Sequence, residues 1–363
     1  MPEKVIGEPE NETMEMKIAF IAGLSDKKLI EKIQPLIMLN KVYQIDLYRR
    51  FPIEYKGVNW ISIPYFFQKN LFLSELFRFG KLLLLANKYD LVIGCNQINH
   101  GLFAYIIGLI FHTPVIQIVT TDIDSVLKNP ITRIILLSSD CCGVRGEISK
   151  QKLTSAGYKG DIEIIANVYP FIQESSKELP KEYDLVFVAH YPAKAKDIPW
   201  LLKVLQFLIQ RCPHIKIAII GKGHKEKYYF EIEKTGLSNN VVFLGELHND
   251  DLNDAYMKSK LFILTSKVEG LPMVLIEAMS FGLPVIVTDV GDIPWIVRDG
   301  IEGYLIKNGM TEQMVDAIVN LLKDSEKRKI LGENSRKRYN EIVIDFQPEV
   351  IEKSWEKLIS RLS

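Results

Sequence analysis

Two glutamates, Glu269 and Glu277, have seven residues between them and could bind a charged or hydroxyl-rich ligand. The residues after Glu269 start a helix, because Gly270 permits a sharp turn and Pro272 suits the first helical position. No Ser, Thr, Asp or Asn directly precedes Pro272 as a cap. The first N–H groups of this helix are therefore open to an anion, which the helix dipole also favours.

Glu277 is the one charged residue of the expected helix, 272–281, and apolar residues surround it. The helix should therefore be buried. A carboxylate in such a helix needs a partner such as an arginine, or a hydroxyl-rich ligand, and the spacing leaves both open. Gly282 should end the helix, and the apolar run 284–288 is typical of a short strand.

The stretch 269–289 resembles the donor-site signature of glycosyltransferase family 4, which belongs to the glycosyl transferases group 1. Besides the two glutamates, the match includes Gly270, Pro272, Ala278, Met279, Gly282 and Pro284. The resemblance implies an α/β chain of the GT-B fold. In this fold two Rossmann-like, doubly wound domains face a central cleft, and a C-terminal helix crosses back to the first domain.

The elements that would position this stretch agree with two domains, since the chain of 363 residues is too long for one ordinary domain. In the second half, short apolar strands alternate with helices, which predicts a doubly wound parallel sheet. The expected parts are a flexible tail at 1–15, an N-terminal Rossmann-like acceptor domain at 16–170, a linker at 171–182, a C-terminal nucleotide-sugar donor domain at 183–345 and a returning helix at 346–363.

The resemblance implies a retaining, metal-independent glycosyltransferase of the hexosyltransferase type. Its donor would be a nucleotide sugar, UDP- or GDP-linked, and its acceptor a glycan or a lipid-linked molecule. No other cofactor and no metal is expected. The catalytic residues implied are Glu269, Lys196, His190 and Asp122. The donor-binding residues implied are Glu277, Gly270, Leu271, Pro272, Met273, Val274, Gly221, Gly223 and Gly23.

The chain departs from the family pattern at several of these positions. The family clamps the donor diphosphate with an arginine and a lysine six positions on, and here His190 stands at the arginine position before Lys196. Lys194 is an alternative for the lysine. Histidine cannot offer a planar fork, although a diphosphate would favour its charged form. Thr121 replaces a histidine near the transferred sugar, and Trp295 replaces an acid, which we interpret as a packing change.

The composition restricts the classes of molecule that the protein is expected to bind. With 45 basic and 45 acidic residues, nothing indicates nucleic acid. Cys95, Cys141, Cys142 and Cys212 lack metal-ligand spacing and are expected to be buried thiols. Asp122 and Asp124 spell D-x-D, a metal–nucleotide motif of another glycosyltransferase fold, but the rest of the chain argues against that use.

The expected location is the cytoplasm or the inner face of a membrane. The tail lacks the features of a signal peptide, and the apolar run 102–111 is too short to cross a bilayer. Residues 66–88 mix apolar and basic residues at helical spacing, so part of them could lie on a membrane. We favour a core helix with solvated lysines there.

Two other functions stay open. The departures at His190 and Thr121 would suit a non-catalytic relative that binds a nucleotide or glycan as a partner subunit. A different enzyme of the same fold, such as a nucleotide-sugar epimerase, would also use a donor site of this kind.

Overall fold

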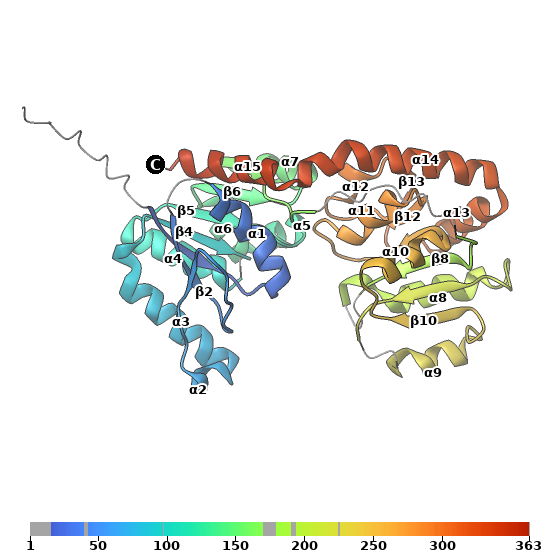
Figure 1. Ribbon diagram of the computed structural model, residues 1–363, viewed down its shortest axis with the longest axis horizontal. Coiled ribbons are helices and arrows are strands. Elements are labelled where there is room, and N and C mark those ends of the chain that lie inside the picture. The colour runs from blue at the N-terminus through green and yellow to red at the C-terminus, as the bar shows by residue number, and fades with distance from the viewer. Residues whose placement is uncertain are drawn as a thin grey trace, which may run out of the picture.

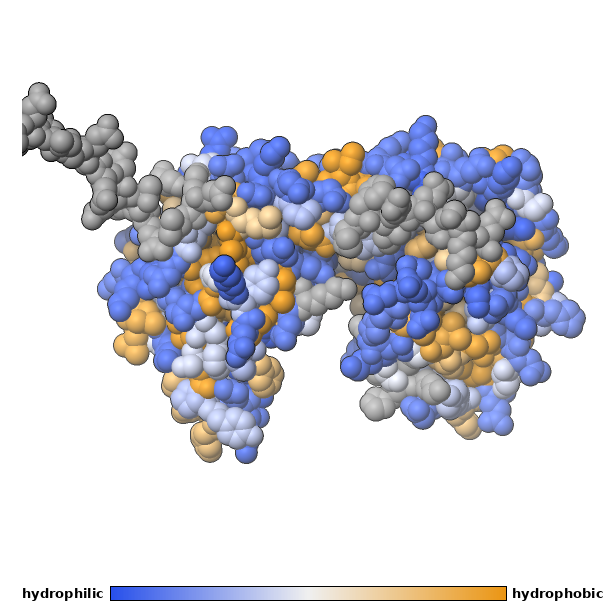
Figure 2. Space-filling view, in the orientation of Figure 1, coloured by the Kyte–Doolittle hydropathy of each residue, from blue (hydrophilic) through white to orange (hydrophobic). Residues whose placement is uncertain are grey.

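The computed structural model describes residues 16–39, 43–96, 98–169, 179–189, 194–223 and 226–362. These residues form two lobes that are joined along one side by the last helices (Figure 1). The space-filling view shows a notch between the lobes (Figure 2). The expected tail at 1–15, most of the linker at 171–182, and His190 lie outside the described residues.

The N-terminal lobe is a seven-stranded parallel sheet in the order β3-β2-β1-β4-β5-β6-β7. Helices cover both faces, so the central strands of the sheet are buried along their whole length. The strands are β1 Met16–Ile21, β2 Tyr43–Tyr48, β3 Val58–Trp60, β4 Leu91–Cys95, β5 Val115–Ile118, β6 Cys141–Val144 and β7 Asp161–Ile164. The helices are α1 Asp26–Met38, α2 Tyr65–Gln68, α3 Leu71–Leu85, α4 His100–Phe111, α5 Ile123–Lys128, α6 Pro130–Leu137 and α7 Glu147–Ser155.

The C-terminal lobe is a six-stranded parallel sheet in the order β10-β9-β8-β11-β12-β13. Its strands are β8 Tyr183–Val188, β9 Ile217–Ile220, β10 Val241–Gly245, β11 Ser259–Leu264, β12 Val285–Thr288 and β13 Gly303–Ile306. Its helices are α8 Ile198–Leu208, α9 Glu226–Lys234, α10 Asn249–Met257, α11 Met273–Ser280, α12 Ile293–Ile296 and α13 Thr311–Lys323. The doubly wound parallel sheet that we expected here is confirmed.

Helices α14, Ser325–Ile342, and α15, Pro348–Ser360, carry the chain back to the N-terminal lobe (Figure 1). Helix α15 packs on α1 and β7. Trp355 of α15 is fully buried, and its ring lies 6.4 Å from that of Phe20 in β1. The returning helix that we expected is therefore confirmed.

The region 66–88 corrects one expectation. It forms two helices, α2 and α3, separated where the side chain of Asn70 caps α3 by accepting a hydrogen bond from the N–H of Leu73. Only Ser74, Arg78 and Leu82 of α3 are buried. Leu71, Phe72, Leu76 and Leu84 are more than half exposed, so the core-helix interpretation is wrong for these residues, while the other apolar side chains of α3 are half-buried or buried. Across the described parts of the chain, no helix combines the length and apolarity needed to span a bilayer.

Candidate functional site

The site lies where the strand order of the C-terminal sheet reverses. Strands β8 and β11 are neighbours there, with Leu185 paired with Leu261. In open parallel sheets the loops at the carboxyl ends of two such strands diverge and leave room for a ligand. Lys196 follows β8, and Glu269 follows β11. The topology therefore brings together two residues that are 73 positions apart.

Glu269 is fixed in this crevice by contacts from both loops. The ammonium group of Lys196 forms an ion pair with Oε1 of Glu269, and both side chains are largely buried. Ser266 Oγ donates a hydrogen bond of 2.6 Å to the same oxygen. The two loops are also tied through their backbones, since the N–H of Lys267 donates to the carbonyl of Ala195 at 2.7 Å. The carboxylate and the ammonium are thus held before any ligand arrives.

Helix α11 begins directly after this loop, and no side chain caps its start. Pro272 occupies the position before the first helical residue, Met273, so our expected helix start was one residue early. Leu271 is buried, whereas Met273 and Val274 are partly exposed. Gly282 adopts a φ of +65° directly after the helix, which ends it as expected. The uncapped N–H groups and the helix dipole make this start suitable for an anion.

Glu277 is half-buried on α11 and accepts a hydrogen bond of 3.0 Å from the hydroxyl of Tyr256. Burial, together with the charge of Glu277, raises the pKa of Tyr256 well above its ordinary value. The phenol therefore stays protonated and keeps donating. A tyrosine, which the spacing did not suggest, orients this carboxylate.

The other expected residues occupy different loop ends. Gly221 and Gly223 follow β9, and both have φ values near +145° that favour glycine. Gly23 follows β1, where an added Cβ would lie 2.5 Å from Cε1 of His100. The described structure does not place these glycines against Glu269 or Lys196. Thr121 stands in the loop between β5 and α5.

Asp122 has a local structural contact. Its carboxylate caps α5 by accepting hydrogen bonds of 2.9 Å from the N–H and the hydroxyl of Ser125. Its other oxygen, Oδ1, is buried and has no hydrogen-bond partner in the part of the chain that the structure describes. Asp124 binds Lys152 at 2.6 Å. Within the described ranges, no group of three or more acidic, histidine or cysteine side chains could hold a metal ion.

Sequence reasoning missed Arg145, which reaches the donor loop from the N-terminal domain. This arginine follows β6 and is only 8% exposed. Its Nη1 donates to Oδ1 of Asn167 at 2.9 Å, while its Nε is buried and has no hydrogen-bond partner among the described residues. A Cβ added to Gly270 would lie 3.4 Å from that Nε. The signal that could have found it is its position at the carboxyl end of a parallel strand.

Further lysines surround Arg145. Burial lowers the pKa of Lys28 from its ordinary value, and the charges of Arg145 and Lys196 lower it further. Burial and the charge of Arg145 lower the pKa of Lys32 to about 7. The charge of Glu269 raises the pKa of Lys28, so Lys28 lies close enough to interact with Lys196 and Glu269 of the C-terminal domain.

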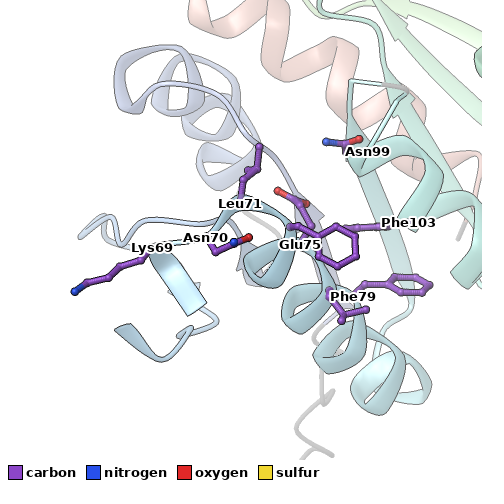
Figure 3. Close-up of a pocket in the computed structure, with 9 residues that line it drawn as sticks. Lys69, Asn70, Leu71, Glu75, Phe79, Asn99 and Phe103 are labelled. Carbon is purple, nitrogen blue, oxygen red and sulfur yellow. The ribbon is translucent and has the colours of Figure 1, made fainter. Parts of the chain in front are cut away.

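A separate pocket of about 750 Å³ lies in the N-terminal domain between the starts of α3 and α4. Figure 3 shows Glu75 and Phe103 directed toward each other from the two helices, with Asn99 beyond them. Its lining is mainly apolar and comprises Lys69, Asn70, Leu71, Phe72, Glu75, Leu76, Phe79, Asn99 and Phe103. Its composition, apolar with a few polar groups, is that of a ligand pocket.

Comparison with known proteins agrees with this geometry. Residues 169–338 match the family model of the glycosyl transferases group 1. Sulfoquinovosyl transferase SQD2 from Arabidopsis thaliana is 36% identical over 138 residues, which are 37% of this chain. The chain spans only 26% of the length of that relative.

Two solved structures share the fold of the whole chain. Sucrose-phosphate synthase from Thermosynechococcus elongatus has a TM-score of 0.76 at 18% identity, and the match covers 96% of this chain and 99% of that one. Anabaena Alr3699/HepE in complex with UDP-glucose has a TM-score of 0.72 at 17% identity, covering 96% of this chain and all of that one. Residues 169–338 are therefore similar to the glycosyl transferases group 1, and the two Rossmann-like domains of the chain have the GT-B fold.

Proposed function

We propose that the protein is a retaining, metal-independent glycosyltransferase, of the family 4 type, that moves a sugar from a nucleoside diphosphate to a glycan or lipid-linked acceptor. The observation that carries this proposal is the ion pair of Lys196 and Glu269, held at the sheet's switch point in front of the uncapped start of α11. A nucleotide sugar carries a charged diphosphate and many hydroxyl groups. The cation and the N–H groups suit its diphosphate, and the carboxylate suits its hydroxyl groups.

Each group has a role in binding the donor. The N–H groups near 271–274 bind the diphosphate, as helix starts bind anions elsewhere. Glu277, oriented by Tyr256, accepts hydrogen bonds from ribose hydroxyls. Glu269 accepts one from a hydroxyl of the sugar. The donor is a UDP- or GDP-sugar, and the UDP-glucose bound to the structurally similar Anabaena protein supports UDP.

The transfer needs no protein nucleophile. The acceptor oxygen attacks the anomeric carbon from the face that the diphosphate leaves. As the bond from that carbon to the phosphate oxygen breaks, the leaving phosphate takes the proton of the acceptor hydroxyl. Lys196 offsets the negative charge that grows on the leaving group, which is electrostatic stabilisation of the transition state. Configuration at the anomeric carbon is then retained.

The experiment is a calorimetric titration with UDP, GDP, UDP-glucose, UDP-N-acetylglucosamine and GDP-mannose in the presence of EDTA. We expect one nucleotide to bind with a micromolar Kd, which corresponds to about 8 kcal/mol. Glu277→Gln should weaken that binding at least about tenfold, because a neutral amide is a weaker acceptor for ribose hydroxyls. Failure of all five ligands to bind would contradict the proposal and favour a non-catalytic relative.

The role of Lys196 is tested separately by turnover. Lys196→Met should reduce donor consumption strongly, whereas Lys194→Met should not. Lys194 is the matched control, since it is an exposed lysine in the same three-residue turn, Lys194–Lys196. NMR of the sugar product distinguishes the mechanisms. A retained anomer on an acceptor supports transfer, and free UDP with an isomerised sugar would indicate an epimerase.

The acceptor domain also supports contact with a membrane surface. Large apolar side chains are exposed at the free tip of the N-terminal lobe, over α2 and α3 (Figure 2). They are Tyr65, Phe66, Leu71, Phe72 and Leu76, each more than half exposed. Lysines accompany them, with the ammonium of Lys69 4.9 Å from the centre of the Tyr65 ring. Aromatic and basic residues together suit the interface of an anionic bilayer.

The pocket between α3 and α4 opens beside this surface and would take the apolar part of a lipid-linked acceptor. Co-sedimentation with phosphatidylglycerol vesicles tests this contact, with phosphatidylcholine vesicles for comparison. The double variant Phe72→Ser with Leu76→Ser should lose binding. Leu84→Ser is the matched control, because Leu84 is 84% exposed at the other end of α3. Equal binding by all three proteins would refute the membrane contact.

A further inference from the structure

The start of helix α7 in the N-terminal domain is capped from the other domain. Gly146 stands before α7 with extended backbone and can offer no side-chain cap. Instead, Asp292 accepts a hydrogen bond of 2.8 Å from the N–H of Ser149 and one of 2.6 Å from its hydroxyl. A carboxylate in this position also interacts favourably with the helix dipole. The contact joins residues that are 143 positions apart.

The two domains meet here at van der Waals distance. A Cβ added to Gly146 would lie 2.6 Å from Cε3 of Trp295 and 2.8 Å from Cγ of Asp292. Asp292 is fully buried. Trp295, which we had interpreted only as a packing change, therefore contacts the opposite domain. Both residues belong to the sequence DVGDIPW, so one short segment of the C-terminal domain supplies the cap and the adjoining contact surface.

The same segment also holds the donor loop. The N–H of Asp292 donates to the carbonyl of Gly270 at 2.9 Å. Gly291, at a φ of +59°, packs so closely that an added Cβ would lie 2.1 Å from the carbonyl oxygen of Glu269. On the other side of the loop, Arg145 of the N-terminal domain packs near Gly270. The loop that carries Glu269 therefore lies between Asp292 and the acceptor domain.

We propose that Asp292 is a positioning residue for glycosyl transfer: its carboxylate caps α7 while its backbone holds Gly270, so that Glu269 is placed correctly only when the two domains are together. This inference rests on the proposed function. Donor binding belongs to the C-terminal domain alone, whereas the catalytic arrangement needs the contact across the domains. Loss of the cap should therefore lower the turnover rate and leave the affinity for the donor unchanged.

The experiment compares Asp292→Ala, Gly146→Ala and Glu302→Gln with the wild-type chain. Gly146→Ala leaves Asp292 intact but puts a methyl group into the contact. Glu302 is the matched control, because it is also fully buried but accepts hydrogen bonds from the N–H and the guanidinium of Arg298 in its own domain. Two quantities are measured: the Kd of the nucleoside diphosphate identified in the donor screen, and kcat for donor consumption at saturating donor, including transfer to water.

We expect Asp292→Ala and Gly146→Ala to lower kcat at least thirtyfold while the Kd stays within threefold of the wild type. Glu302→Gln should leave both unchanged at temperatures where it is folded. The inference is overturned if kcat of Asp292→Ala stays within threefold of the wild type. It is also overturned if Kd and kcat worsen together in the Asp292 and Glu302 variants, because that pattern marks a merely structural role. If the wild type binds no nucleotide, the proposed function itself has failed.

Discussion

Replacing Lys32 with methionine should stabilise the protein in acid and lose that advantage in alkali. Lys32 lies on α1 and is 1% exposed. Its ammonium donates one hydrogen bond, of 2.9 Å, to the carbonyl of Ile165. Burial is the largest cause that lowers its pKa from 10.5 to about 7, and the nearby charge of Arg145 adds to it. The folded protein therefore resists charging this lysine.

The sign of the effect follows from proton binding. Between pH 7 and 10.5 the unfolded chain holds a proton on Lys32 that the folded chain releases, so stability rises with pH across this window. At about 1.4 kcal/mol per pKa unit, the penalty is roughly 5 kcal/mol at pH 6 and roughly 2 kcal/mol at pH 9. Methionine removes the penalty but leaves the Ile165 carbonyl unpaired, which costs about 1–3 kcal/mol.

With a cost of about 2 kcal/mol for the unpaired carbonyl, we expect Lys32→Met to gain about 3 kcal/mol at pH 6 and nothing at pH 9. Urea unfolding at pH 6, 7.5 and 9 measures this, with the fluorescence of buried Trp355 reporting on the N-terminal lobe. Lys88→Met, at an exposed lysine of the same lobe, is the control and should show no such trend. A Lys32→Met variant with the same free-energy change at pH 6 and pH 9 would refute the reasoning.

Three further outcomes are expected. Tyr256→Phe should weaken UDP binding about tenfold, because Glu277 loses the hydroxyl that orients it, and calorimetry with unchanged affinity would exclude that role. Gly282→Ala should lower the unfolding free energy by about 1–2 kcal/mol, since alanine resists a φ of +65°, and an unchanged Tm would contradict this. In the native protein, a thiol reagent such as DTNB should modify Cys212 before the buried Cys95, Cys141 and Cys142. Burial raises the pKa of the Cys95 thiol to about 12 and that of the Cys141 thiol to about 11. Equal rates of modification would contradict the burial of these cysteines.

The sequence predicted the secondary structure of the stretch 269–289 well, because the signals for it are local. The uncapped helix start, the terminating Gly282 and the strand after it all lie within one short stretch. Strand β3 was missed because three residues, Val58–Trp60, give too short a pattern for period-based reasoning.

The contacts between the domains could not be predicted in this way. Asp292 and Ser149 are far apart in sequence, and each looks like an ordinary polar residue in its own segment. The tyrosine partner of Glu277 comes from the end of α10, 21 residues away, and no periodicity connects the two. The break between α2 and α3 occurs at Asn70, whose side chain caps the start of α3. This local hydrogen bond favours a helix start at Asn70 over a continuous helix through it.

Two unfavourable features of this fold lie near each other in the N-terminal domain, close to the donor loop. Lys32 is buried with a depressed pKa, and Arg145 keeps a buried N–H without a hydrogen-bond partner in the described ranges. Natural sequences tolerate such costs chiefly where function needs them. Measuring donor turnover on Lys32→Met decides whether that holds here. If the variant is more stable but slower, the buried charge serves the reaction through Arg145 and its neighbours; if it is more stable and equally fast, Lys32 is a structural cost without a function.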